Sequence, residues 1–359
     1  PAVQRLLARP KHRPTPASLS VRMTHLRLSH YLFDAMQAIR VHTLEGIEAL
    51  RFESADLPAP GAGEIKVAVH AAGCNFADTL QIKGLYQTKP PLPFVPGLEL
   101  AGVVKEVGDG VTRVREGDRV MGWVPWGGYA SEAIMSDWAA IPMPDSMSWT
   151  DGAAFPICYG TAYGAFSIGR IALKRGETAM VHGAAGGVGL AAVDVAKAMG
   201  ATVVATGGAP HKLAACVEQG ADHTINYREE SVRDAVKASV GGVDVVLDPV
   251  GGDVFDQSLR CTNRDGRLIV IGFAAGTIQQ IPSNYLLLKN ISVAGYGFSI
   301  YSRADHGHYQ RVFSELNDFY ADGLLHPRID SVLPLKQTGA ALSKLLERTA
   351  IGKVVVTVD

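Results

Sequence analysis

The sequence contains few cysteines and almost no net charge. Its four cysteines, Cys74, Cys158, Cys216 and Cys261, are scattered and form no CxxC pair. This pattern excludes a disulfide framework and a zinc knuckle, and it fits a reducing compartment such as the cytoplasm. The formal net charge of -1 provides no electrostatic surface for nucleic acid or for an acidic membrane, so we expect neither as a partner.

Long apolar runs, short internal repeats and low-complexity linkers are also missing. No uninterrupted apolar stretch is long enough to span a bilayer. Hydrophobic residues nevertheless make up 47% of the 359 residues. A chain of this length and composition is sufficient for two domains and a substantial core.

The segment Pro1–Ala35 differs in composition from the rest of the chain. It has several basic residues and a single acidic residue, Asp34. This composition is typical of a mitochondrial transit peptide. Two simpler explanations, a disordered basic tail or an upstream extension ahead of a start at Met36, are favoured over it. We therefore expect the folded region to begin near residue 36.

The most informative stretch is Glu177–Gly200. Thr178–His182 is a short apolar run typical of a buried parallel strand, and Val188–Met199 has helical periodicity. The small-residue turn between them resembles the first turn of a dinucleotide-binding unit, in which N–H groups at the helix start hold a pyrophosphate. The residues predicted to bind a cofactor in this turn are Gly183, Ala184, Ala185, Gly186, Gly187, Val188 and Gly189.

Individual positions of this turn have distinct expected roles. Gly186 allows close approach of the backbone to the phosphates, and Gly189 allows the helix to pack against its strand. One departure is Ala184, which stands where the G-x-G-x-x-G fingerprint has its first glycine. The pattern gains weight because further strand and helix units follow it.

Alternating strands and helices continue for about 100 residues, which predicts a doubly wound parallel sheet. The expected strands are 201–206, 223–227, 243–250, 267–273 and 291–296. The expected helices are 211–219, 229–240 and 254–261. A ligand is then expected at the carboxyl ends of the strands.

The end of the second strand indicates which cofactor is bound. NAD-specific folds usually place an acid there to hold the ribose hydroxyls. Here Gly207 follows the strand, no acid is present before Lys212, and Tyr227 ends the next strand. A 2′-phosphate is attracted by a lysine and repelled by an acid. We therefore predict NADPH, with Gly207, Lys212 and Tyr227 around its adenosine end.

The remaining segments predict a second domain. From Gln37 to about Pro144 the pattern is all strand and turn, which indicates a compact β-barrel. Helical stretches are expected near 151–168 and 308–320, and the closing strands 331–335 and 353–358 could return to the first domain. The expected domains are residues 36–158 with 297–359, and residues 159–296.

Several motifs resemble a known family when they are taken together and in order. They are GCNFADTL (73–80), GLYQTKPPLPFVPGLELAG (84–102), GDRV (117–120), GTAYGA (160–165), GAAGGVG (183–189), GADHTINYREE (220–230), VIGFAAG (270–276) and PSNYLLLKN (282–290). Residues 36–359 resemble a zinc-free medium-chain dehydrogenase/reductase of the quinone oxidoreductase (zeta-crystallin-like) branch, and the last motif resembles one of its quinone oxidoreductase-like subgroups. This resemblance implies a GroES-like β-barrel, a Rossmann domain, and a homodimer formed through an edge strand of the cofactor domain.

The zinc-dependent members of this family offer a useful contrast. Cys74 lies near their cysteine ligand, but Leu98 stands where their Gly-His-Glu motif has histidine, which leaves only Glu99. Zinc requires four nitrogen or sulfur ligands, or three with a water. We therefore predict no metal, and we interpret Cys74 as a small buried residue.

The resemblance also implies roles for individual residues. Asn75 and Thr161 match pocket residues near the nicotinamide, and Tyr86 matches a tyrosine lining the substrate cleft. Gly272, Phe273 and Phe298 match positions where the chain passes the nicotinamide. Asp78 is equally well explained as a helix cap, and Lys353 either contacts the cofactor or is a solvated strand residue.

These expectations lead to a function with two alternatives. The first choice is an NADPH-dependent oxidoreductase that passes hydride to a quinone. The first alternative is a C=C reductase of alkenals, enones or enoyl thioesters, in which Tyr86 stabilises an enolate and Lys83 and Lys89 attract phosphates. The second alternative is a cofactor-binding or structural protein without turnover.

Overall fold

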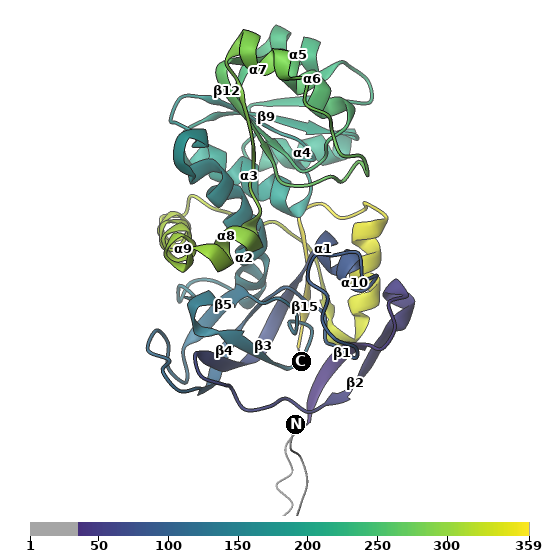
Figure 1. Ribbon diagram of the computed structural model, residues 1–359, viewed down its shortest axis with the longest axis vertical. Coiled ribbons are helices and arrows are strands. Elements are labelled where there is room, and N and C mark those ends of the chain that lie inside the picture. Colours follow the sequence, from purple (N-terminus) through teal and green to yellow (C-terminus); the bar gives the residue numbers. More distant parts are fainter. Residues whose placement is uncertain (1–34, 359) are drawn as a thin grey trace, which may run out of the picture. The chain divides into compact units, whose positions relative to one another are not determined.

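The computed structural model describes residues 35–358 (Figure 1). The described residues belong to a single compact unit that begins at Ala35. The predicted basic extension, residues 1–35, therefore lies outside the described residues apart from Ala35. Within residues 35–358, no helix combines the length and the apolar character needed to cross a bilayer.

Six parallel strands form one sheet, in the order β10-β9-β8-β11-β12-β13. The strands are β8 (Thr178–Val181), β9 (Thr202–Gly207), β10 (His223–Asn226), β11 (Val243–Asp248), β12 (Thr262–Val270) and β13 (Ser292–Gly295). The chain winds outward from β8 in one direction and then from β11 in the other. A doubly wound parallel sheet is thereby confirmed, and its switch point lies between β8 and β11, where such sheets bind ligands.

Four of the helices that connect these strands follow the predicted order, and the fifth, α7, was not predicted. They are α3 (Gly187–Ala198), α4 (Pro210–Glu218), α5 (Val232–Ser239), α6 (Asp253–Cys261) and α7 (Ser283–Lys289). The prediction was wrong about the start of α5, which it placed at Glu229. Ser231 is the true N-cap, because its hydroxyl accepts a hydrogen bond from the Asp234 N–H at 3.3 Å.

Seven strands form the second sheet, in the order β14-β15-β3-β4-β5-β7, with β6 also paired to β3. They are β3 (Glu64–Cys74), β4 (Glu99–Val107), β5 (Arg119–Trp123), β6 (Glu132–Ser136), β7 (Ala140–Pro142), β14 (Ile329–Pro334) and β15 (Lys353–Thr357). All pairs are antiparallel except β14 with β15. A separate antiparallel pair is formed by β1 (Met36–Val41) and β2 (Leu50–Ala55).

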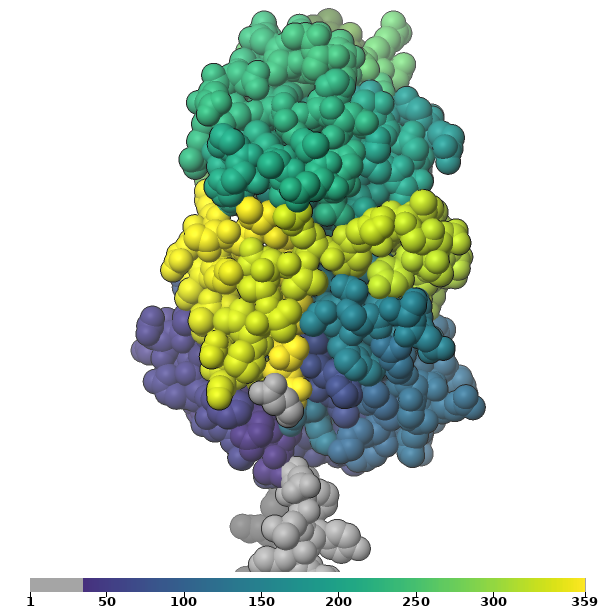
Figure 2. All heavy atoms as spheres, turned by 180° about the vertical axis from the view of Figure 1, so that it is seen from behind, coloured from purple at the N-terminus to yellow at the C-terminus, as the bar shows by residue number. Residues whose placement is uncertain are grey.

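The last strand, β15, lies in the second sheet next to β3, a strand near the start of the folded unit. Val354 lies opposite Cys74, so β15 pairs with the end of β3. In Figure 2 the closing residues, in yellow, lie between the early strands, in purple, and the parallel-sheet region, in green. An early strand, β3, and the last strand, β15, therefore belong to one sheet. The limits of the two domains stay a prediction.

Five further helices accompany the second sheet. They are α1 (Phe76–Gln81), α2 (Trp149–Ser167), α8 (Phe298–Ala304), α9 (His306–Ala321) and α10 (Thr338–Leu346). Short 3-10 turns lie at Gly46–Ala49, Asp137–Ala139, Gly169–Ile171 and Leu335–Gln337. The prediction that residues 37–144 hold only strands and turns is wrong at α1. This helix forms because Asp78 accepts a hydrogen bond from the N–H of its N-cap residue, Asn75, at 2.7 Å.

Helix α2 connects the two sheets. It contacts β3, β4 and β5 on one side and α3 on the other. Phe155, Ala162 and Phe166 are fully buried, in the same hydrophobic cluster as Met121 of β5 and Val181 of β8. A helix that is apolar on all sides is typical of a buried position, and this one gives both sheets a shared core.

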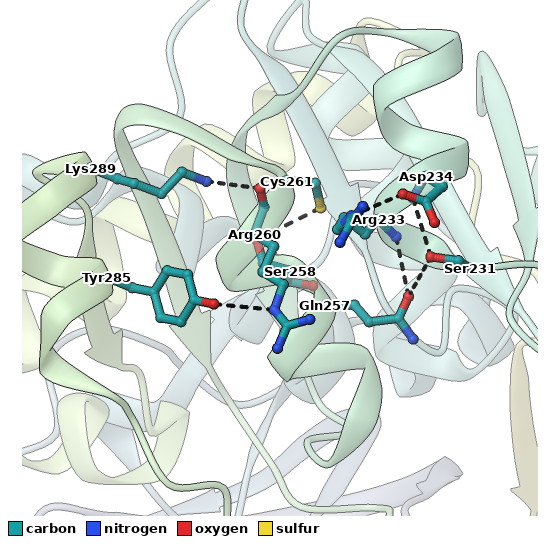
Figure 3. Close-up of polar contacts among 9 residues, drawn as sticks. All are labelled: Ser231, Arg233, Asp234, Gln257, Ser258, Arg260, Cys261, Tyr285 and Lys289. Atoms are coloured by element: carbon teal, nitrogen blue, oxygen red, sulfur yellow. Dashed lines mark hydrogen bonds and ion pairs between the residues drawn. The ribbon is translucent and has the colours of Figure 1, made fainter.

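Two polar side chains of helix α7, Tyr285 and Lys289, point toward α6 (Figure 3). The Lys289 ammonium donates to the carbonyl oxygens of Leu259, Arg260 and Thr262 at 3.1, 2.9 and 2.7 Å. These carbonyls lie at the C-terminal end of α6, where backbone acceptors lack helical partners and the helix dipole attracts a cation. In contrast, Leu287 and Leu288 are 82% and 78% exposed. The helix is thus fixed to α6 through polar contacts and presents leucines to its surroundings.

Candidate functional site

The glycine-rich turn after β8 has the backbone that a dinucleotide-binding turn needs. Gly183 has a φ of 57°, which L-residues with a side chain rarely adopt. At Gly189 a Cβ atom would collide with the backbone of Gly183 and Ala184, so α3 packs directly on the turn. Ala184 is fully buried, and its N–H donates to the Thr206 carbonyl at 3.1 Å. The alanine in place of the first glycine is therefore accommodated inside the fold.

The N-terminus of α3 is arranged to receive an anion. Gly186 is the N-cap and Gly187 is the first helical residue. The nearest atom to a Cβ built on Gly186 is the Gly183 oxygen at 3.5 Å, so the space beside this residue is open. The first N–H groups of a helix have no helical partner, and the helix dipole favours negative charge there. Ala185 is buried and Val188 is half-buried beside them.

The turn is fastened to the residue that precedes β15. The N–H of Gly352 donates to the carbonyl of Ala185 at 3.0 Å, and Gly186 forms an isolated parallel bridge with Gly352. The glycine-rich turn and the second sheet are therefore linked by backbone contacts at this point.

A cluster of cations lies after β9, around Lys212 of α4. Burial lowers the pKa of Lys212, and the positive charges of Arg228 and Arg348 lower it further. The Arg228 Nε lies 3.1 Å, and the Tyr227 hydroxyl 2.8 Å, from where a Cβ of Gly208 would be. Lys212 also donates to the Arg348 carbonyl. These three cations and one hydroxyl form a site suited to a phosphate.

Two members of this cluster were missed by sequence analysis. Arg228 directly follows Tyr227, so the position of Tyr227 after the third strand was a signal that could have identified it. Arg348 is 136 residues from Lys212 and has no local pattern that points to a ligand. Its contact depends on the path of the chain from α10 to β15.

A buried polar cluster lies between β3, β4 and β15. The Lys353 ammonium forms an ion pair with Glu99 and donates to the Asn75 Oδ1 at 2.6 Å. The Asn75 Nδ2 donates to the Glu99 Oε1 at 2.8 Å. The residues Asn75, Glu99 and Lys353 are only 8%, 0% and 4% exposed. Each member therefore depends on the others for its hydrogen bonds.

Lys353 is not a solvated strand residue, so that alternative is wrong. Burial alone would lower its pKa, but the surrounding groups Cys158, Glu99 and Asp78 raise the pKa above the ordinary lysine value. The side chain also passes the glycine-rich turn, since its Cδ lies 3.6 Å from where a Cβ of Gly187 would be. Contact of Lys353 with a cofactor stays a prediction.

Glu99 also connects β4 to the middle of α2. Pro156 lies inside α2 and has no N–H to donate. The N–H of the next residue, Ile157, donates to the Glu99 Oε2 at 2.7 Å. The carboxylate thus supports the second half of α2, which carries the predicted pocket residue Thr161.

Asp78 lies directly beside this cluster and is fully buried. Its Oδ2 accepts hydrogen bonds from the Tyr129 hydroxyl at 2.6 Å and from the Asn75 N–H at 2.7 Å. Its Oδ1 is buried without a hydrogen-bond partner. Burial raises the pKa of Asp78 to about 7, although these two hydrogen bonds oppose the shift. The cap interpretation of Asp78 agrees with its contacts.

Tyr86 lies in the segment between α1 and β4, facing α8. Burial raises its pKa, while a hydrogen bond with Ser299 and the charge of Arg303 act in the opposite direction. Arg303 donates to the Thr88 hydroxyl at 3.3 Å and lies over the Trp123 ring, with its Cζ 4.8 Å from the centroid. The Tyr86 hydroxyl is therefore influenced by the Ser299 hydroxyl and the Arg303 cation, and its contact with a substrate stays a prediction.

The other predicted residues lie on the elements expected for them. Thr161 is buried in α2, and the Phe298 ring packs against the adjacent Gly160. Gly207 ends β9, while Gly272 and Phe273 follow β12, with the Phe273 side chain 48% exposed. The contacts of these five residues with a cofactor stay predictions.

The residues at the expected zinc position do not fit a metal. Cys74 is buried, and burial raises the pKa of its thiol to about 12. Leu98 offers no ligand atom, and Glu99 is engaged by Lys353. Within residues 35–358, no group of three or more His, Cys, Asp or Glu side chains is placed to hold an ion. The predicted absence of metal stays a prediction for the isolated protein.

Comparison with protein families agrees with the two-sheet architecture. Residues 61–145 match the alcohol dehydrogenase GroES-like domain, and residues 187–318 match the domain described as zinc-binding dehydrogenase.

Comparison with individual relatives identifies the branch of the family. The chain is 41% identical over 300 residues to quinone oxidoreductase-like protein 2 of Mus musculus, covering 83% of this chain and 85% of the relative. It is 33% identical over 326 residues to the quinone oxidoreductase of Homo sapiens, covering 89% and 97%. The chain belongs to the medium-chain dehydrogenase/reductase family, and it is an oxidoreductase of the quinone oxidoreductase-like type.

A solved relative has the same fold. The quinone oxidoreductase of Escherichia coli, determined as a complex with NADPH, superposes with a TM-score of 0.81 at 30% identity, covering 90% of this chain and all of the other (100%). The predicted GroES-like domain and Rossmann domain are thereby confirmed.

Proposed function

We propose that this protein is an NADPH-dependent oxidoreductase that transfers hydride to a quinone without a metal. The observation that carries the proposal is the cluster of Lys212, Arg228 and Arg348 at the end of β9, together with the open α3 N-terminus. The named relatives supply the acceptor, because both are described as quinone oxidoreductases or similar to them.

The residues present fit NADPH. The N–H groups at Gly187 and Val188 would hold the pyrophosphate, because the Gly186 N–H already donates to the Gly183 carbonyl. The three cations with the Tyr227 hydroxyl would hold the 2′-phosphate. When bound, NADPH supplies the hydride, and the protein supplies binding, orientation and electrostatics. Asn75, Thr161, Gly272, Phe273 and Phe298 are proposed to line the nicotinamide end.

We expect Lys212→Ala to raise the KM for NADPH about tenfold, a loss of about 1.4 kcal/mol, while the KM for NADH changes little. The physical reason is that only NADPH carries the 2′-phosphate that this ammonium would attract. Initial rates with both cofactors measure the effect, and Lys237→Ala, an exposed lysine of α5, is the matched control. Equal effects on the two cofactors would contradict the 2′-phosphate assignment.

The arrangement around Tyr86 favours one alternative, a reductase of α,β-unsaturated carbonyls. Hydride addition to the β carbon leaves negative charge on the carbonyl oxygen, which a hydrogen-bond donor stabilises. The Tyr86 hydroxyl, near Ser299 and Arg303, is such a donor. A quinone needs no dedicated acid, so the two functions differ in their dependence on this hydroxyl.

The test is NADPH oxidation with ortho- and para-quinones, straight-chain alkenals and an enoyl-CoA, each repeated with NADH and with a chelator. Quinone turnover that prefers NADPH and survives chelation supports the proposal. Turnover with alkenals or enoyl-CoA alone would assign the C=C reductase, in which case Tyr86→Phe should be impaired. Tight NADPH binding without any turnover would support the second alternative, a binding or structural protein.

We also propose a homodimer formed through the β13 edge. β13 is the edge strand of the six-stranded sheet, and an unpaired edge offers free N–H and C=O groups to a second copy. The adjacent α7 exposes Leu287 and Leu288. An exposed apolar patch beside an unpaired edge is typical of a protein interface.

Leu287→Glu combined with Leu288→Glu is expected to convert the dimer to a monomer at micromolar concentration, because two charges would be buried without partners. Sedimentation velocity measures the mass of both forms. Val217→Glu, at an apolar residue of α4 that is 55% exposed, is the matched control and should stay dimeric. A monomeric wild type, or a dimeric double variant, would contradict this interface.

The proposed location is the cytoplasm, in keeping with four free, buried cysteines. A mitochondrial location is the alternative if residues 1–35 act as a transit peptide. Imaging of the full chain and of a form lacking these residues, each tagged at the C-terminus, distinguishes the two.

A further inference from the structure

Asn75 makes hydrogen bonds that commit both of its amide protons. Its Nδ2 donates to the Glu99 Oε1 at 2.8 Å and to the Gly73 carbonyl at 3.3 Å. An asparagine side chain has two N–H donors, so neither remains for a bound molecule. The carbonyl oxygen, Oδ1, is the atom of this side chain that can still meet a ligand, and it can only accept.

The orientation of this carboxamide is fixed by charge. A lysine ammonium can only donate hydrogen bonds, and an ionised carboxylate can only accept them. Lys353 therefore requires the oxygen of Asn75 on its side, and Glu99 requires the nitrogen on the other. A flipped amide would place a donor against Lys353 and an acceptor against Glu99.

The cluster lies next to the turn that receives the cofactor phosphates. The Lys353 side chain contacts the position of Gly187, the first residue of α3, and the preceding residue Gly352 is hydrogen bonded to Ala185. The Lys353 side chain thus contacts both Asn75 and the N-terminus of α3, and Asn75 is 8% exposed. A group attached to the pyrophosphate is within reach of this region.

We propose that the Glu99–Lys353 ion pair is a positioning device that holds the Asn75 oxygen toward the nicotinamide half of the cofactor. Asn75 then accepts a hydrogen bond from a ribose hydroxyl or from the nicotinamide carboxamide, and it does not donate to the substrate. This inference rests on the proposed NADPH function. It assigns the stabilisation of a substrate oxygen to Tyr86 or to a cofactor hydroxyl.

The double variant Glu99→Gln with Lys353→Met tests the proposal. Removing both charges together avoids an unpaired buried charge, which is the main cause of unfolding in single variants. The carbonyl of the new glutamine can accept from Ile157, and its amide can donate to Asn75 if the Asn75 carboxamide flips. The flip keeps a hydrogen bond between position 99 and Asn75 at the cost of the longer bond to the Gly73 carbonyl. Asn75 then presents N–H groups where the proposal requires an acceptor.

Two ligands separate positioning from general damage. NADPH contains the nicotinamide half, whereas adenosine 2′,5′-bisphosphate contains neither the nicotinamide nor its ribose. We expect the double variant to bind NADPH about tenfold more weakly, because the Asn75 N–H would then face a hydrogen-bond donor of the nicotinamide half. We expect it to bind the bisphosphate with the affinity of the wild type. Fluorescence or calorimetric titration measures both dissociation constants.

The matched control is a second buried ion pair in the same chain, Glu177 with Arg267, whose side chains are 20% and 8% exposed. Arg267 lies in β12 and Glu177 precedes β8, away from the carboxyl ends of these strands. Glu177→Gln with Arg267→Met should leave the affinity for NADPH unchanged.

The outcomes are distinct. If the double variant binds both ligands as the wild type does, or loses affinity for both equally, the proposal is overturned. If the wild type binds no NADPH, the proposed function fails as well. If the double variant does not fold, Asn75→Leu replaces it, since this change leaves the ion pair in place. NADPH binding unchanged in that variant overturns the proposal, and selective weakening supports it.

An analogue of the reduced cofactor identifies which of its groups donates the hydrogen bond to Asn75. The 3-acetylpyridine analogue of NADPH has no carboxamide N–H but keeps the ribose hydroxyls. If the analogue binds the wild type and the double variant equally, the carboxamide is the group held by Asn75. If the double variant still binds it more weakly, a ribose hydroxyl is that group. Both results support the acceptor role of Asn75.

Discussion

Replacing Lys353 with methionine is expected to lower the free energy of unfolding by about 3–5 kcal/mol, the usual effect of removing one partner of a buried ion pair. The change would leave the Glu99 carboxylate in an environment with no exposure to water, and Asn75 would lose its donor. Much of this effect is the penalty for an unpaired buried charge and not the net stability that the pair provides.

Urea unfolding of the wild type, Lys353→Met, Glu99→Gln and the double variant measures this effect as a double-mutant cycle. The double variant should recover most of the stability that Lys353→Met loses, because no charge is then left unpaired. If the losses of the two single variants simply add in the double variant, Lys353 and Glu99 are not energetically coupled and the prediction is wrong.

Asp78→Asn is expected to remove a pH dependence of about 4 kcal/mol from the stability of the protein. The value follows from the rise in the Asp78 pKa from 3.8 to about 7, at 1.36 kcal/mol for each pKa unit. Because the folded-state pKa is raised, the protonated form is favoured on folding. The contribution of Asp78 is therefore fully present below about pH 4 and is lost as pH rises through about 7.

The asparagine variant isolates this contribution. Its side-chain oxygen can accept from the Asn75 N–H and the Tyr129 hydroxyl as Asp78 does, while its amide occupies the place of the unpaired Oδ1. Urea unfolding between pH 4 and 8 should give a difference between the two proteins that grows in favour of the variant as pH rises. Parallel stability curves would show that Asp78 does not titrate in this range.

The parts of the site that the sequence predicted are those encoded over short distances. The turn at 183–189 could be recognised because the strand, glycines and helix lie within one unit, and Asp78 because a cap acts three residues from its partner. The Glu99–Lys353 pair could not be found in this way. Both residues lie in strands with ordinary patterns, and β15 becomes a neighbour of β3 only through the complete fold.

Other differences have equally physical causes. Helix α7 was not predicted because its leucines are exposed and its lysine is bound to α6, the reverse of the usual distribution. The start of α5 was placed too early, since the Ser231 cap is a weaker signal than the acidic run before it. Arg348 was missed because its role depends on a contact between segments far apart in sequence.

The pairing of β15 with β3 has a consequence for the order in which this protein is made. Asn75 and Lys353 are separated by 278 residues, and the whole parallel sheet lies between them. While the chain leaves the ribosome, β3 has an open side until the cofactor domain has been synthesised. Contacts of such high sequence separation form slowly, since a long loop must close first. The nascent second sheet is therefore open to chaperones and proteases until β15 has been made, and the glycine-rich turn at 183–189 gains its Gly352 contact last.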